Sequence, residues 1–446
     1  MVGRFESYLF DYESIFRSQT KRFFDKAKAY CQGIIMSKLS NIERISEEIS
    51  ANYHQMQHFI TNSPWDHRAL LDQVALDVSR SLPKQKLTGL IIDESGWEKK
   101  GKKSVGVAPQ YCGNAGKVCN SQVAVFGALS NGDFASMVDA RLYLPEVWSQ
   151  DVVRCDDAGI PESQRTFKMK WEIALEIIRH QQSLGVLFNF VGGDGYYGNS
   201  IEFAEGIDTM GYVYMLDIHS NLTIYLEKPE IAIPPAKGKR GRKPSKEKPL
   251  AQGIRADKYM SELGEDDWRH LEVRNTSKGV LTGDYHFRVV YIWDQDNNRM
   301  LRRLLIIRRT KTKEGDYEYK YSFTNANLEQ YTKKGLAYMQ AQRFFIEHCI
   351  KENKQVLGMD EYQTRKWLAW QHQIALNLLV STFILKEKLL CFDQLPLLSA
   401  NDIKRWITFK LYRQMTEDEM IDQMFERHCR RQKDINVAFQ KQNLMC

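Results

Sequence analysis

The chain has 446 residues, of which 43% are hydrophobic and 27% are charged. These proportions exclude a chain that is disordered throughout, and they leave room for roughly two to four domains with their own cores. Lys and Arg total 63 against 56 Asp and Glu, so the net charge of +7 permits a nucleic-acid partner but does not require one.

The cysteines and the apolar segments indicate in which cellular compartment the protein works. Eight cysteines are scattered without a Cys-x-x-Cys pair, which argues against a zinc ribbon or a thioredoxin-type site and favours reduced thiols. The first residues, MVGRFESYLFDYES, lack the apolar core of a signal peptide. The most apolar late stretch, Ile374 to Leu385, is too short to span a bilayer. We therefore expect a soluble, cytoplasmic protein without a membrane partner.

Residues 1–85 are predicted to form a helical N-terminal domain. Apolar residues such as Phe16, Phe23 and Ala27 recur at helical spacing, and Gly and Pro are sparse. Basic residues are interleaved throughout this region. A helical support domain and a DNA-binding domain both fit this pattern, and the sequence leaves the two open.

From residue 86 the pattern becomes that of strands. Three adjacent strands of an antiparallel meander are predicted in LTGLIID, which ends at Asp93, and in the segments SVGVAPQYCG and SQVAVFGALSNGDFASMVDARLYLP, where SNGD is typical of a hairpin turn. After them we expect a helix in FKMKWEIALEIIRHQQSLG, a strand in LFNFVGGDGYYGN, a short helix in SIEFAEGIDTM and a strand in GYVYMLDI. The order β-β-β-α-β-α-β is the α/β layout expected of a ribonuclease-H-like fold, and we assign residues 86–210 to the first part of such a core.

The helix that should complete this core is delayed by a long segment. Residues 211–328 read as a β-rich insertion, with strand-like runs in YHFRVVYIWD, RMLRRLLIIRR and DYEYKYSFTN. Within it, residues 234–249 form a Pro-, Gly- and Lys-rich arm, in which positions 237–248 hold seven basic residues and one acid. The second part of the core is predicted at 329–385, beginning with a long helix, and a helical C-terminal tail at 386–446.

Three acidic residues are expected to meet in this fold. Asp93 ends the first predicted strand and Asp194 ends the fourth, and their tips should be neighbours because those strands pair at the centre of such a sheet. The third acid must come from the long helix, where Glu347 and Glu352 compete.

Helical geometry separates the two glutamates. At about 100° per residue, Glu347 lies within roughly 40° of Arg343 and Lys354, whereas Glu352 lies about 140° around the helix from Glu347. We therefore select Glu347, on the face that also carries an arginine and a lysine.

Carboxylates gathered in this way suit two-metal phosphodiester chemistry. Two divalent cations about 3.5–4 Å apart can activate a nucleophile and stabilise the leaving oxygen. Mg²⁺ prefers oxygen ligands, so we predict two Mg²⁺ ions, which Mn²⁺ can replace, held by Asp93, Asp194 and Glu347, with Asp93 between them. Arg343 and Lys354 are expected to contact DNA phosphates. Glu94 should point to the other side of its strand.

These segments resemble the DDE transposases of bacterial insertion sequences. The resemblance is carried by IIDESGWEKKGKKSVGVAPQYCG, NSQVAVFGAL, VGGDGYYGN and RFFIEHCIKENKQVLGMDEYQTRKWLAWQHQIAL. They are most similar to the subgroup with a β-rich insertion and a Tyr-Arg-Glu-Lys helix signature. Arg343, Glu347 and Lys354 match the spacing of that signature, whereas Gln340 stands at the Tyr position.

The resemblance implies metal-dependent cut-and-paste excision and strand transfer by phosphodiester hydrolysis and transesterification. The implied partners are the terminal inverted repeats of the element, the target DNA and a second copy of the chain, as a homodimer in a synaptic complex at the bacterial nucleoid. Related enzymes stack a flipped base on a Trp of the insertion. Trp268, in the polar context DDWRH, is preferred here over Trp293, which is expected in the core.

Further DNA contacts are predicted from basic residues in the insertion. Lys278 lies in a Ser-Lys-Gly segment similar to the same subgroup. The arm resembles a minor-groove-binding segment that would insert Arg242, and a solvated charged loop is the alternative. Its predicted DNA-contacting residues are Lys239, Arg240, Arg242 and Lys243.

Two other functions remain open at this point. One is a non-catalytic DNA-binding protein derived from a transposase, against which the retention of all three acids argues. The other is a different nuclease of the same fold, such as a structure-specific resolvase, against which the insertion and the basic arm argue.

Overall fold

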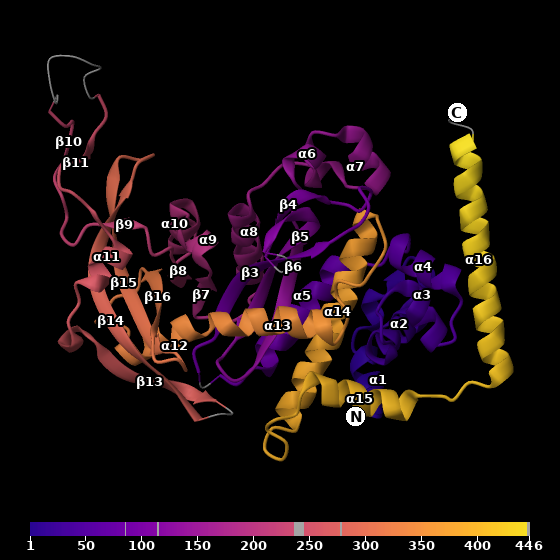
Figure 1. The fold of residues 1–446 in the computed structure, drawn as a ribbon. Coiled ribbons are helices and arrows are strands. Elements are labelled where there is room, and N and C mark those ends of the chain that lie inside the picture. Colours follow the sequence, from indigo (N-terminus) through magenta and orange to yellow (C-terminus); the bar gives the residue numbers. More distant parts are fainter. Residues whose placement is uncertain (85, 114–115, 236–244, 277–278, 444–446) are drawn as a thin grey trace.

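A computed structural model describes residues 1–84, 86–113, 116–235, 245–276 and 279–443 (Figure 1). The helices are α1 Val2–Phe10, α2 Phe24–Met36, α3 Ile42–Glu48, α4 Tyr53–Thr61, α5 His67–Ser81, α6 Glu146–Ser149, α7 Val152–Ala158, α8 Lys170–Ser183, α9 Gly195–Gly198, α10 Ile201–Thr209, α11 Ala256–Ser261, α12 Lys333–Ala341, α13 Arg343–Gln355, α14 Trp367–Leu390, α15 Ala400–Leu411 and α16 Glu417–Asn443. The strands are β1 Arg17–Ser18, β2 Lys21–Arg22, β3 Gly89–Glu98, β4 Ala108–Cys112, β5 Lys117–Ser130, β6 Ala135–Leu142, β7 Phe190–Gly193, β8 Val213–Asp217, β9 Thr223–Ile224, β10 Ile231–Ala232, β11 Lys248–Pro249, β12 Ile254–Arg255, β13 Arg269–Thr276, β14 Gly279–Asp294, β15 Arg299–Lys311 and β16 Tyr317–Thr324.

One large mixed sheet organises the protein, so the chain is an α/β protein. Ten strands follow the order β13-β14-β15-β16-β8-β7-β3-β5-β4, with β6 paired to β5. The neighbours β8, β7 and β3 are parallel, and the pairings on either side of them are antiparallel. The parallel strands require crossovers, which α8 and the pair α9 and α10 supply, because a tight turn cannot join parallel strands.

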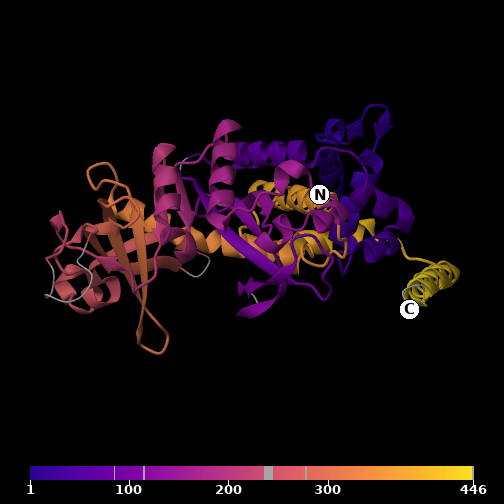
Figure 2. The same cartoon turned by 90° about the horizontal axis from the view of Figure 1, so that it is seen from above.

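The strands predicted as an insertion continue the same sheet. The link is short: in β16, Ser322 pairs with Asp217 and Phe323 pairs with Leu216 of β8. From there β16, β15, β14 and β13 extend the sheet away from the N-terminal helices, as seen from above in Figure 2. β8, which lies inside the predicted range 211–328, is thus a neighbour of β7 in the centre of the sheet.

β3 is longer than the sequence indicates. Its parallel pairing with β7 stops where Ile91 pairs with Gly192, but its antiparallel pairing with β5 continues until Glu98 pairs with Ser121. The prediction that Asp93 ends this strand is therefore wrong, because β5 supplies backbone partners for five more residues. Asp93 instead lies two residues beyond the end of the parallel pairing.

Successive β3 residues face opposite layers of helices. Leu90 and Ile92 belong to the buried cluster that includes α8 and α10, whereas Ile91 belongs to the cluster that includes α13 and α14. Since strand side chains alternate, Asp93 shares the α13 side with Ile91 and Glu94 shares the α8 side.

The N-terminal region is mainly helical, as predicted, with a small β1–β2 hairpin between α1 and α2. Its helices pack around α14, so residues from both ends of the chain share one core. Tyr30 of α2 donates its hydroxyl to Gln373 of α14 at 2.5 Å, and His372 sits between the carbonyl oxygens of Ile60 and Trp65. These hydrogen bonds satisfy polar groups that α14 brings into the interior.

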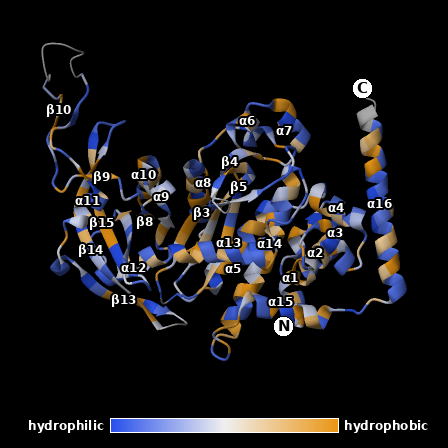
Figure 3. Cartoon of the chain, viewed as in Figure 1, coloured by the Kyte–Doolittle hydropathy of each residue, from blue (hydrophilic) through white to orange (hydrophobic). Residues whose placement is uncertain are grey.

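Among the described residues, one helix, α14, is long and apolar enough to cross a membrane by length and composition alone. However, 94% of its most apolar window is buried inside the protein. The apolar stretch Ile374 to Leu385 is part of this longer helix. Its burial is that of a core helix. Figure 3, coloured by hydropathy, shows hydrophilic and hydrophobic residues mixed along an outer helix such as α16.

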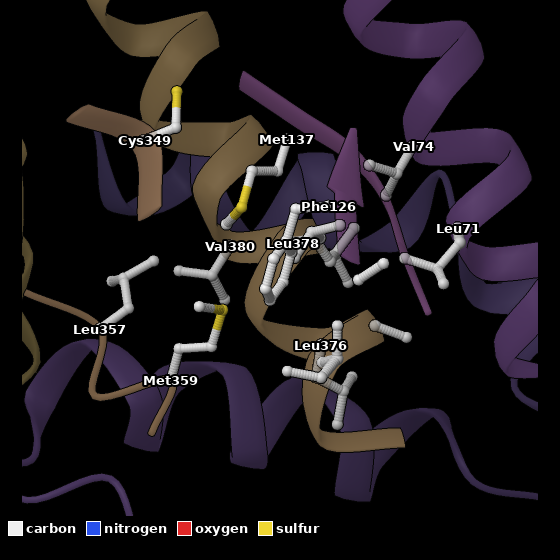
Figure 4. Packing of buried hydrophobic residues seen from close by; sticks show 14 of the residues in the cluster. Leu71, Val74, Phe126, Met137, Cys349, Leu357, Met359, Leu376, Leu378 and Val380 are labelled. Atoms are coloured by element: carbon white, nitrogen blue, oxygen red, sulfur yellow. The ribbon is translucent and has the colours of Figure 1, made fainter. Parts of the chain in front are cut away.

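A substitution in α14 tests how much the shared core contributes to stability. Leu378 is fully buried, and Figure 4 shows it packed with Phe126 of β5 and Met137 of β6. We expect Leu378→Ala to lower the free energy of unfolding by about 2–5 kcal/mol through lost burial and a residual cavity. Leu390→Ala, at the 64% exposed end of the same helix, should change it by less than about 0.5 kcal/mol. Chemical denaturation of both variants measures the difference.

Candidate active site

Asp93 is the first carboxylate of the candidate site. Its Oδ1 accepts a hydrogen bond from the backbone N–H of Glu94 at 2.8 Å. Burial raises the pKa of Asp93 to about 8, and the negative charges of Asp194 and Glu94 add to that rise, while Arg343 opposes it. A carboxyl group that resists ionisation in this way is one that a nearby cation would stabilise in its charged form.

Asp194 is brought beside Asp93 by the neighbouring strand β7. It follows Gly193 and caps α9, its Oδ1 accepting from the backbone N–H groups of Tyr196 at 3.0 Å and Tyr197 at 3.5 Å. Burial raises its pKa, the charge of Glu94 raises it further, and Arg343 together with the two N–H groups lowers it. The parallel pairing of β3 with β7 therefore brings two of the three predicted carboxylates together.

Glu94 lies on the opposite face of β3 from Asp93, as the alternation of strand side chains predicts. Its Oε1 accepts from Lys170 Nζ of α8 at 2.7 Å. It is nevertheless close enough to raise the pKa of both aspartates, so it belongs to the electrostatic surroundings of the site.

Glu347 lies on α13 but is not gathered with the aspartates. Its side chain is 50% exposed, and its Oε1 accepts from Arg343 Nη1 at 2.5 Å. The competing Glu352 is bound by Lys388 of α14, at 2.7 and 3.0 Å. Within the described ranges, no group of three or more His, Cys, Asp or Glu side chains is close enough to hold a metal ion.

A fourth acid, Asp217, joins the site and was missed by the sequence analysis. It ends β8, and its Oδ2 forms an ion pair with Arg343 Nε at 2.8 Å. Burial lowers the pKa of Arg343, but the surrounding carboxylates of Asp217, Glu347, Asp93 and Asp194 outweigh it and leave that pKa raised. The signal was present in YMLDI, where an apolar strand also ends in an acid beside β7.

Gln340, at the expected Tyr position, supports this arginine indirectly. Gln340 Nε2 donates to Ser322 Oγ at 2.9 Å, and Ser322 Oγ donates to Asp217 Oδ1 at 2.7 Å. The chain of contacts thus runs from α12 through β16 and β8 to Arg343. A buried amide thus stands where the resemblance leads one to expect a phenol, and Ser322 links that amide to Asp217.

Lys354 is not placed as expected. Its side chain is buried, and its Nζ donates to the backbone carbonyl of Gly96 at 2.8 Å and lies 5.4 Å from the centre of the Trp97 ring. Burial lowers its pKa. In this conformation the ammonium anchors α13 to the extended end of β3, so it is not presented to a phosphate.

The predicted DNA-contacting residues of the insertion divide into two groups. Trp268 is half-buried, with its ring 4.5 Å from the Arg309 guanidinium and 6.2 Å from the rings of His286 and Tyr319. Trp293 was expected in the core, but it is only half-buried and lines a cavity of about 620 Å³ beside α9. Outside the described residues lie Lys278, Lys239, Arg240, Arg242 and Lys243.

Gly198, at the end of α9, makes the close approach that the site requires. A Cβ atom at this position would overlap the backbone carbonyl oxygen of Asp217. We expect Gly198→Ala to force β8 and α9 apart, to lower the free energy of unfolding by about 1–3 kcal/mol and to reduce any activity of the site. Gly3→Ala, where the new methyl meets no atom within 4 Å, is the matched control. Thermal unfolding and a cleavage assay on both variants test this.

The donor set is suited to a hard divalent cation. Asp93 and Asp194 offer carboxylate oxygens, and their mutual repulsion is relieved by positive charge. Glu347 is the third predicted ligand, but its partner in the structure is Arg343. The residues present therefore fit a metal at the two aspartates, with the third carboxylate engaged elsewhere.

Known proteins resemble this chain over part of its length. A family model described as DDE superfamily endonuclease matches residues 12–280. The chain is 33% identical over 217 residues to a probable transposase for insertion sequence element IS701 from Microchaete diplosiphon, which covers 47% of this chain and 52% of that protein. The chain thus aligns with only about half the length of that curated relative.

A solved structure was also found, that of a piggyBac transposase synaptic complex with hairpin DNA. Its TM-score is 0.35 at 12% identity, over 95% of this chain and 79% of that one, a likeness too low to support an argument. The family match covers more than half of this chain and includes Asp93 and Asp194. The resemblance to DDE enzymes expected from the sequence is confirmed, and the chain belongs to the DDE superfamily of endonucleases.

Proposed function

We propose that this protein is a DNA transposase of an insertion sequence, with a ribonuclease-H-like catalytic core, that excises its element and joins it to target DNA. The observation that carries the proposal is the meeting of Asp93 and Asp194 on the neighbouring strands β3 and β7 in a chain of an endonuclease family. The similarity to an insertion-sequence transposase supports the choice of substrate.

In this proposal Asp93 and Asp194 hold divalent metal, two Mg²⁺ ions or Mn²⁺ in their place, and Glu347 completes the ligand set. When bound, the ions would activate an attacking oxygen and stabilise the leaving oxygen of a phosphodiester. Arg343 has to exchange Glu347 for another anion, and a DNA phosphate suits its planar, five-donor group. Asp217 holds Arg343 at the edge of the site while this exchange takes place.

The proposed partners are the terminal inverted repeats of the element, target DNA and a second copy of the chain in a synaptic complex. The strands β13 to β16 would extend the DNA-binding surface beyond the site. Trp268 is proposed to stack on an unpaired base, which requires that it leave Arg309. The protein would work in the bacterial cytoplasm, at the nucleoid.

The test is cleavage of a duplex that carries the element's own terminal repeat. We expect nicking at the repeat end with Mg²⁺ or Mn²⁺, no product with EDTA, and joining of the released 3′-hydroxyl to a plasmid. Branched DNA without the repeat should compete poorly. Binding of the repeat without cleavage in either metal would instead identify a DNA-binding protein that has lost its activity.

A further inference from the structure

The C-terminal helix α16 is attached to the rest of the protein by its polar side. Arg427 Nη1 lies 3.0 Å from Glu47 Oε1, and Arg430 Nη2 lies 2.8 Å from Glu43 Oε1, both acids being on α3. Gln423 Nε2 donates to the backbone carbonyl of Glu47 at 3.1 Å. Figure 1 shows α16 standing beside the N-terminal helices at the edge of the molecule.

The opposite side of α16 is apolar and faces solvent. Ile421, Phe425, Ile435 and Phe439 are 54%, 69%, 49% and 62% exposed. At about 100° per residue they lie within roughly 80° of one another and about 180° from the side that binds α3. We call this set the outer stripe. A helix of a globular protein normally turns such a stripe inward, so the arrangement here is reversed.

The spacing of the outer stripe is that of a coiled-coil seam. With His428 and Gln432 between the two apolar pairs, the seam positions are separated by 4, 3, 4, 3 and 4 residues. The pattern is symmetric about position 430. When two copies are laid antiparallel on this centre, Ile421 meets Phe439, Phe425 meets Ile435, and His428 meets Gln432. Apolar residues then face apolar residues, and the polar pair sits in the middle.

The distribution of charge along α16 distinguishes a parallel pair of helices from an antiparallel pair. Residues 417–426 contain five acids and no base, whereas residues 427–440 contain four bases and one acid. A parallel pair would place the acidic halves side by side, which is unfavourable. An antiparallel pair places each acidic half along the basic half of the other copy.

We propose that α16 is a self-association element, in which the outer stripe of one chain packs antiparallel against the outer stripe of a second copy. The dimer forms without DNA, so the proposal stands whether or not the chain cleaves DNA. The helix of 27 residues is about 40 Å long, which is ample for such a seam. The polar side of α16 remains bound to α3 of its own chain. The two copies therefore contact each other through their outer stripes and are related by a two-fold axis.

Sedimentation equilibrium of the full chain without DNA tests the proposal. We expect the mass of a dimer, and we expect Ile435→Asp to raise the dimer Kd by at least about tenfold, because a carboxylate would be buried in the seam. Val437→Asp is the matched control: Val437 is also 49% exposed on the same helix, but it lies on the α3 side. Its dimer Kd should stay within about twofold of wild type. A single-chain mass at all concentrations, or equal effects of the two variants, would overturn the proposal.

Cys429 reports the direction of packing. It is exposed and lies next to the centre of the seam, so an antiparallel pair brings the two Cys429 side chains to the same flank near the two-fold axis. A parallel pair places them on opposite flanks. A short bis-maleimide should therefore cross-link the wild-type dimer and fail with Cys429→Ser. Absence of that cross-link in a chain of dimer mass contradicts the antiparallel arrangement.

Discussion

Asp194→Asn is expected to reduce metal-dependent cleavage of terminal-repeat DNA by at least about 10³-fold, roughly 4 kcal/mol of transition-state stabilisation. The substitution removes the charge that a metal requires. It leaves the fold intact because the amide oxygen of Asn can still accept from the N–H groups of Tyr196 and Tyr197 and cap α9. A loss of cleavage with unchanged thermal unfolding is the result that supports a ligand role.

The matched control for this substitution is Asp151→Asn. Asp151 also caps a helix, α7, by accepting from the backbone N–H of Arg154 at 2.9 Å, but it lies outside the candidate site. The Asp151→Asn variant should cleave terminal-repeat DNA at the wild-type rate. If Asp194→Asn also cleaved at the wild-type rate, the aspartate would be only a cap and the site assignment would be wrong.

The second large effect is a dependence of the protein's stability on pH and on bound metal. The pKa of Asp93 is raised from 3.8 to about 8, so the folded state holds this proton more tightly than the unfolded state does. Between about pH 4 and pH 8 the unfolded chain is ionised at this group while the folded one is still protonated. The metal-free protein should therefore lose stability as the pH rises through this window, and the penalty is complete above pH 8.

Thermal unfolding in EDTA from pH 5 to pH 9 measures this penalty. We expect Asp93→Asn to melt a few degrees above the wild type at pH 8, and the advantage to shrink at pH 5, because the amide carries no ionisation cost. Mg²⁺ should stabilise the wild type increasingly with pH and the variant much less, since metal competes with the proton for the same oxygens. Equal melting temperatures of the two proteins across the range would show that Asp93 ionises freely.

The sequence predicts the parts of the site that depend on single elements. Asp93 and Asp194 follow apolar runs, and the alternation along a strand separates Asp93 from Glu94. Helical periodicity puts Arg343 and Glu347 on one face, and the contact between them follows from the spacing alone. These features could be found because each depends on the spacing of residues along one strand or one helix.

What could not be predicted depends on which elements pack against each other. The length of β3 is fixed by β5, and the extended end of β3 then offers the Gly96 carbonyl that takes Lys354 into the interior. Asp217 matters because β8 pairs with β7, and Arg343 reaches it from α13. Periodicity shows which face of a helix carries Lys354 or Arg343, but it does not show what lies opposite.

The joint between β16 and β8 connects the outer strands of the sheet to the candidate site. Two residue pairs are in register between these strands, and the backbone N–H of Ile218 donates to the carbonyl of Tyr321 just beyond them. One of the two pairs is Ser322 with Asp217, the residue that forms an ion pair with Arg343. The carboxylate of Asp217 thus takes part both in the contact between the two halves of the sheet and in the ion pair with Arg343.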